Sequence, residues 1–169
     1  SLMFHAENSG DAEGRGGIFV TLIAGDLTEQ VVGLAITVHR HTGPGLLESV
    51  YEQCLAHALQ RAAIAFERKV SIPLVYRGSK IADGFRADFV VAERLILEIK
   101  SLAVVLPVHH AQLLTYLRLS GLQIGLLMNF NEPRLIDGLH RVVLSRSAAA
   151  GSPANIPSAA PSHGLSEAP

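Results

Sequence analysis

Apolar positions along the chain change their spacing several times, and each change marks an expected element. From Leu27 to His41 they recur every three or four residues, which predicts an amphipathic helix. The turn Thr42-Gly43-Pro44-Gly45 ends this helix. The same spacing returns from Leu46 to about Ala62, so the pattern predicts a second helix directly after the turn.

Strand-like segments occupy the middle of the chain. Their apolar and β-branched residues favour three strands, at Phe66–Tyr76, Ile81–Val91 and Arg94–Lys100. Pro73 cannot donate a hydrogen bond in a sheet, so it predicts an edge strand or a bulge. The link from Val91 to Arg94 is short enough for a hairpin.

One more helix and one or two strands complete the pattern. Pro107 precedes a helix expected from about His109 to Leu119. Leu122–Phe130 is a nearly continuous apolar run, which is typical of a fully buried strand, and a last short strand is expected over Gly138–Leu144. The order ααβββαβ(β) predicts a mixed α/β layer with a three-stranded meander and a helical crossover.

The patterned region is bounded by two segments of different composition. Residues 1–17 are rich in Gly, Asn, Asp and Glu, and residues 145–169 are dominated by Ala, Ser, Pro and Gly. Such segments bury too little apolar surface to offset the entropy of ordering. We therefore expect a flexible segment over 1–17, one domain over 18–144 and a disordered tail over 145–169.

Composition narrows the class of protein. Charged residues make up 17% of the chain, below the roughly 25% of typical soluble domains. A well-buried core or the apolar interface of a homo-oligomer would account for this. The one cysteine, Cys54, excludes an internal disulfide and favours a cytoplasmic location. No membrane span is expected. From Asp26 to Arg146, 13 Lys and Arg against 11 Asp and Glu leave a charge of +2, which is modest for a dedicated DNA-binding protein.

Asp88 and Glu98 are the most informative polar positions, because each lies in or beside an apolar strand-like run. A desolvated carboxylate without a partner costs several kcal/mol. The midpoint of the two positions is residue 93, inside the expected hairpin turn, so antiparallel pairing would bring the carboxylates together. Two carboxylates with phosphate oxygens and water are a suitable set of Mg²⁺ ligands.

Lys100 lies two residues after Glu98, so both side chains point to one face of the strand. Its ammonium could orient an attacking water or stabilise charge on a phosphate, and the carbonyl of Ile99 could add a metal ligand. The alternative is a plain ion pair on an exposed strand face. For the bare pattern of an Asp followed by Glu-x-Lys, that alternative is favoured about two to one, because short motifs recur by chance.

Two helical pairs add polar groups. Glu48 opens the second helix, where a carboxylate also interacts favourably with the helix dipole, and Glu52 shares its face, so either could be the surface residue. Gln112 and Tyr116 are four residues apart on a later helix, on one face. They could bind phosphate or position water, or form a polar edge on a core helix.

The histidine pairs at 39/41 and 109/110 do not share a helix face and lack the ligand spacing of a zinc site. Cys54 is explained as a small core residue.

Together these segments resemble a known family. The stretch Gly45-Leu46-Leu47-Glu48-Ser49-Val50-Tyr51 is similar to the signature of the bacterial GxxExxY proteins, a branch of the PD-(D/E)xK nuclease-like superfamily. The likeness continues through Arg86-Ala87-Asp88, Glu98-Ile99-Lys100 and Gln112-Leu113-Leu114-Thr115-Tyr116, and covers about residues 27–144. Ala87 replaces the proline of the superfamily pattern, a tolerated departure because that proline is not a ligand.

The resemblance implies an α/β fold with a restriction-endonuclease-like core, in which a central mixed β-sheet is flanked by helices. By this analogy Glu48, Asp88 and Glu98 hold Mg²⁺ or Mn²⁺, and Lys100 is the catalytic lysine. Gln112 and Tyr116 resemble the Gln-x-x-x-Tyr element of the RecB-like nucleases. The leading hypothesis is a metal-dependent nuclease acting on DNA or RNA. The alternative is a non-catalytic protein that keeps the nuclease-like core as an oligomeric assembly or binding scaffold.

Overall fold

A computed structural model describes residues 15–144, and for residues 15–24 and 82–84 it describes the backbone alone. The expected tail 145–169 and residues 1–14 lie outside the described residues, while 15–17 belong to the first helix. The elements are α1 (Arg15–Thr42), α2 (Glu48–Arg61), β1 (Phe66–Tyr76), β2 (Ser79–Val91), β3 (Leu95–Lys100), α3 (Pro107–Ser120), β4 (Ile124–Asn129), the 3₁₀ helix η1 (Leu135–Gly138) and β5 (Leu139–Val143).

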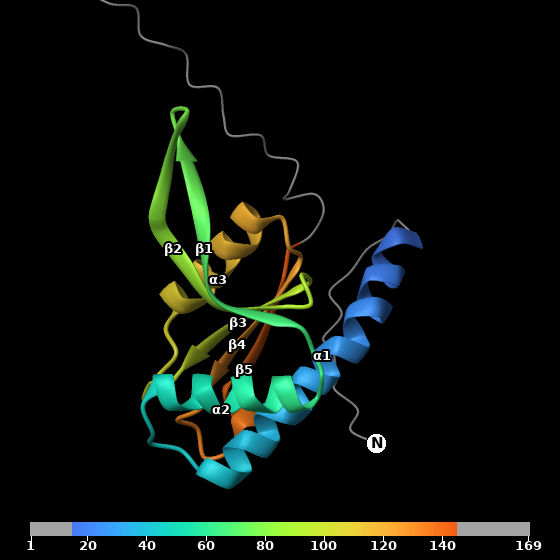
Figure 1. Cartoon of the computed structure of the whole chain (residues 1–169), viewed down its shortest axis with the longest axis vertical. Helices are drawn as coiled ribbons and strands as arrows, with labels where there is room; N and C mark the ends of the chain where they lie inside the picture. The colour runs from blue at the N-terminus through green and yellow to red at the C-terminus, as the bar shows by residue number, and fades with distance from the viewer. Residues whose placement is uncertain (1–14, 145–169) are drawn as a thin grey trace, which may run out of the picture.

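The five strands form one mixed sheet in the order β1-β2-β3-β4-β5. Only β3 and β4 are parallel, and α3 connects them; the other neighbours are antiparallel. This confirms the α/β fold with a central mixed sheet flanked by helices. Helices α1 and α2 cover one face of the sheet and α3 covers the other (Figure 1).

Two apolar clusters separate these layers. Leu95, Leu97 and Ile99 of β3 pack toward α1 and α2, whereas Ile96 packs toward α3. All six residues of β4 are buried, as expected for a strand covered on both faces. The nearly continuous apolar run Leu122–Phe130 therefore corresponds to an internal strand of the sheet, buried on both faces.

The largest difference from the sequence prediction is the start of α1, at Arg15 instead of Leu27. Residues 18–24, Ile-Phe-Val-Thr-Leu-Ile-Ala, are apolar or nearly so at every position. A helix with no polar face shows no 3.6-residue period, so periodicity could not detect this part.

The hairpin of β1 and β2 projects beyond the rest of the sheet (Figure 1). Its turn has positive φ at Arg77 (49°) and Gly78 (78°), as a two-residue hairpin turn of this twist requires. The pairing shifts register between Ile72 and Leu74, where Pro73 cannot donate to the sheet. The predicted position of Pro73, on an edge strand or at a bulge, is confirmed.

Candidate functional site

The Gly-x-x-Glu-x-x-Tyr segment forms a turn that places Glu48 at the first residue of α2. Gly45 has φ +92°, a conformation that L side chains disfavour. Tyr51 is fully buried, and its hydroxyl accepts a hydrogen bond from the Leu46 N–H (3.0 Å) and donates one to the Gly43 carbonyl (2.7 Å). The tyrosine thus ties the turn to α2 and fixes where the helix begins.

Asp88 lies where the pairing of β2 and β3 stops. Val91 pairs with Leu95 and Phe89 with Leu97, which is the register predicted from the midpoint at residue 93. One step further the backbone pairing ends, and the Asp88 Oδ2 atom instead accepts a hydrogen bond from the Ile99 N–H at 2.9 Å. A buried side chain therefore replaces a backbone carbonyl at this position of the sheet.

Three carboxylates meet beside this point, and we call Glu48, Glu52 and Asp88 the acidic cluster. One oxygen of each lies within 4.8 Å of the others. Glu52 and Asp88 are buried, and Glu48 is half-buried. The sequence left open which glutamate of α2 is the surface residue; the structure brings both to the cluster.

Lys69 is a site residue that sequence reasoning missed. Its Nζ donates to Glu52 Oε1 and to Asp88 Oδ1, both at 2.7 Å. The pairing of β1 with β2 passes over Lys69, whose φ is +52°. A signal was available, because Glu67-Arg68-Lys69 places three successive charges in a strand whose side chains should alternate between faces.

Glu98 and Lys100 form the predicted same-face pair, with Lys100 Nζ 2.8 Å from Glu98 Oε1. Glu98 is only 2% exposed, and its Oε2 has no hydrogen-bond partner within the part of the chain that the structure describes. Burial and the nearby Asp88 charge outweigh Lys100 and raise the pKa of Glu98 to about 7. This pair is not an exposed surface pair.

The charges of these groups are coupled. Burial, opposed by Lys100 and reinforced by Asp88 and Glu52, raises the pKa of Glu48. Burial alone would lower the pKa of Lys100, but the hydrogen bond to Glu98 and the acidic neighbours raise it. Carboxylates held this close repel one another, and a cation between them relieves that repulsion.

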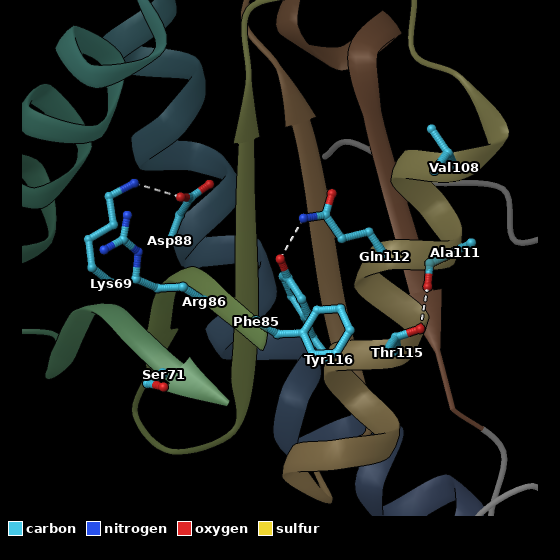
Figure 2. Close-up of a pocket in the computed structure, with 10 residues that line it drawn as sticks. All are labelled: Lys69, Ser71, Phe85, Arg86, Asp88, Val108, Ala111, Gln112, Thr115 and Tyr116. Carbon is cyan, nitrogen blue, oxygen red and sulfur yellow. Dashed lines mark hydrogen bonds and ion pairs between the residues drawn. The ribbon is translucent and has the colours of Figure 1, made fainter. Parts of the chain in front are cut away.

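Gln112 and Tyr116 lie side by side on α3, as their spacing predicted. The Gln112 Nε2 donates to the Tyr116 hydroxyl (Figure 2). Burial raises the pKa of Tyr116, and the Glu98 charge adds to this. Both side chains line a cleft of about 910 Å³ that Lys69, Arg86 and Asp88 also line. The cleft therefore connects α3 to the acidic cluster.

The remaining polar candidates have structural partners. His39 Nε2 lies 2.8 Å from the Glu132 carbonyl oxygen. His109 Nδ1 accepts a hydrogen bond from the Leu106 N–H at the start of α3, at 2.9 Å. Cys54 is half-buried and packs against the core of α1 and α2. No helix in residues 15–144 is both long and apolar enough to cross a membrane.

Comparison with known proteins places this arrangement in a family. A family model described as the PD-(D/E)XK nuclease superfamily matches residues 25–142, well over half of the chain. Searches of the curated proteins and of the solved structures find no match. The match contains β1 to β4, most of β5 and all residues of the acidic cluster. The chain therefore belongs to the PD-(D/E)XK nuclease superfamily.

Proposed function

We propose that this protein is a metal-dependent nuclease of the GxxExxY branch, which hydrolyses phosphodiester bonds in DNA or RNA with Mg²⁺ or Mn²⁺. The observation that carries the proposal is the convergence of Glu48, Glu52 and Asp88, with oxygens within 4.8 Å of one another, beside a cleft that Asp88 lines. A cytoplasmic location and a homo-oligomeric state belong to the same proposal.

The side chains fit a divalent cation. Carboxylate oxygens are the ligands that Mg²⁺ prefers. An ammonium group, that of Lys69, already lies between two members of the acidic cluster, so the local field favours a cation there. Glu98 adds a buried oxygen without a hydrogen-bond partner among the described residues. Glu48 and Asp88 would hold the ion, with Glu98 as a third ligand from β3 and Glu52 as a further carboxylate beside them.

When bound, the ion would lower the pKa of a water ligand and neutralise phosphate charge. Lys100, held by Glu98, presents an ammonium that can stabilise the negative charge on the phosphate. The Gln112 amide and the Tyr116 hydroxyl line the cleft and can hydrogen-bond to phosphate oxygens or to the attacking water. Arg86, two residues before Asp88 on β2, also lines the cleft and adds a second positive charge for the backbone of the substrate.

The test compares Asp88→Asn with a matched control, Asp137→Asn, whose carboxylate pairs with Arg134 on the surface. Mn²⁺ and Mg²⁺ binding is measured by calorimetry, and cleavage is measured on labelled single- and double-stranded DNA and RNA. We expect Asp88→Asn to lose at least about 100-fold in metal affinity and in the rate of cleavage. Loss of a residue that only hydrogen-bonds to a metal ligand typically costs about 10- to 100-fold in affinity or activity, and loss of a ligand should cost more. Cleavage that persists in purified Asp88→Asn would exclude the assignment.

A second candidate, a non-catalytic assembly scaffold, is supported by the projecting hairpin. Val75 and Tyr76 are 66% and 59% exposed near its tip, and Ile81 is also exposed. Apolar side chains grouped in this way are typical of interaction surfaces. The scaffold predicts a defined oligomer at micromolar concentration that Tyr76→Ser weakens, and a monomeric mass by light scattering would count against it.

A further inference from the structure

Lys69 is placed as a cation within the acidic cluster. Its ammonium contacts one oxygen of Glu52 and one of Asp88, each at 2.7 Å. The side chain is 40% exposed and lines the cleft, and Figure 2 shows it pointing to Asp88. The same ammonium is thus in contact with two buried carboxylates and accessible from the solvent side.

The charge balance explains why the ammonium is held there. Glu52 and Asp88 are 4% and 6% exposed, so their charges need a close partner. Lys100 is engaged with Glu98 at 2.8 Å, and Arg68 reaches only Glu52, at 3.4 Å. Of the cations in the described part of the chain, Lys69 is the one that contacts Asp88.

The oxygens that Lys69 contacts are those that a metal would need. The Asp88 Oδ2 atom accepts from the Ile99 N–H and so joins β2 to β3, while Oδ1 accepts from Lys69. A Mg²⁺ ion requires ligand oxygens at about 2.0–2.1 Å in near-octahedral geometry. An ammonium on the same oxygens repels the ion and takes up lone pairs that it requires.

The backbone at Lys69 is consistent with a releasable contact. A φ of +52° is uncommon for a residue other than glycine and carries strain. The pairs Arg68–Phe89 and Val70–Ala87 hold β1 to β2 on either side of this residue, which is not itself among the paired residues. The two ion pairs therefore hold Lys69 in place, and their loss would free its side chain without unpairing the strands.

We propose that Lys69 is a built-in counter-ion of the acidic cluster, which a divalent cation must displace from Glu52 and Asp88 in order to bind. The displaced ammonium remains on the cleft wall beside the other polar side chains that line it. This inference rests on the metal site of the proposed function. Lys69 is in this sense a positioning residue: it holds the carboxylates together without metal and opposes the metal that replaces it.

The test is calorimetric titration of Mn²⁺ into wild type, Lys69→Met, Lys69→Arg and Asp88→Asn. We expect Lys69→Met to bind Mn²⁺ about tenfold more tightly than wild type, since a competing contact of about 1.4 kcal/mol corresponds to that factor. Met is unbranched like Lys, so the backbone strain is unchanged. Lys69→Arg, which keeps the charge, should bind no more tightly than wild type.

Lys80→Met is the matched control. It removes the same positive charge, but from an exposed residue near the hairpin tip. It should bind Mn²⁺ as wild type does. Equal or weaker binding by Lys69→Met, with binding still lost in Asp88→Asn, overturns the counter-ion role and leaves the metal site intact. Unchanged binding by Asp88→Asn places the ion elsewhere and overturns the proposed metal site as well.

A measurement on the wild type does not depend on the folding of a variant. A crystal structure of the wild-type protein grown with Mn²⁺ should show the Lys69 ammonium withdrawn from both carboxylates. Thermal melting adds a second readout: without metal, Lys69→Met should melt below wild type, and saturating Mn²⁺ should remove that difference. An Mn²⁺-loaded structure in which Lys69 still contacts Asp88 Oδ1 at 2.7 Å would overturn the proposal.

Discussion

Two buried polar groupings lie at the same ends of neighbouring parallel strands, and they differ in how completely their polar atoms are paired. Asn129 of β4 is fully buried opposite Lys100 of β3. Its amide accepts from the Leu102 N–H and donates to the Leu102 carbonyl, both at 2.9 Å, with longer contacts to Asn131 and Glu132. Every polar atom of this side chain has a partner.

Glu98 lies on the neighbouring strand β3, and its side chain is paired less completely. Glu98 has an unpartnered buried oxygen among the described residues, and burial, reinforced by the Asp88 charge, raises its pKa. A neutral amide with all hydrogen bonds made stabilises the fold, whereas crowded carboxylates destabilise it in the absence of a cation. On the proposed function, the fully paired amide serves the structure, whereas the incompletely paired carboxylate serves metal binding.

Removing the amide of Asn129 should have the largest effect on stability. Asn129→Ala leaves both backbone groups of Leu102 without their partner and creates a cavity, so we expect a loss of about 3 kcal/mol in the free energy of unfolding. Urea denaturation followed by circular dichroism measures this. Asn131→Ala is the control, and an equal loss in that variant would show that the Asn129 amide is not special.

Glu98 should make the metal-free protein less stable as the pH rises. Its folded pKa of about 7 lies above the ordinary value of 4.5, so its stabilising contribution is complete below pH 4.5 and is lost as the pH rises through 7. Between pH 5 and 8 we expect wild type to lose about 2–3 kcal/mol from this group.

The same urea denaturation at both pH values measures the change. Glu98→Gln should show a flatter dependence, and Glu67→Gln, on an exposed residue of β1, should not. A wild-type dependence that Glu98→Gln leaves unchanged would assign the pH effect to another group.

The smallest effect on stability is expected at Tyr116. Tyr116→Phe removes one hydroxyl and its hydrogen bond to Gln112, which should cost about 1 kcal/mol. If the hydroxyl acts on substrate, the rate of cleavage should fall by about 10-fold or more, while Mn²⁺ affinity stays the same. Tyr76→Phe, the same change on the exposed hairpin, is the control for both assays. A rate equal to that of wild type would leave Tyr116 a packing residue.

Much of this fold was predictable from local pattern. The hairpin register around residue 93 followed from the positions of Asp88 and Glu98, and the Glu98–Lys100 pair followed from strand alternation. The part of α1 before Leu27 was not predictable, because residues 18–24 are apolar or nearly so at every position and show no helical period. The sequence left open whether Glu48 or Glu52 is the surface residue, because helical spacing alone does not say which face of α2 meets the sheet.

What the sequence determined by itself was the order of the elements, which side chains share a face within one element, and the residues able to carry charge. These depend on backbone geometry and on spacing within one element, which are local. The meeting of Glu52, Lys69 and Asp88, from α2, β1 and β2, was decided only by the tertiary structure. Such contacts depend on how helix and sheet pack and where a ladder ends, because electrostatic pairing is governed by distance in space and not by distance along the chain.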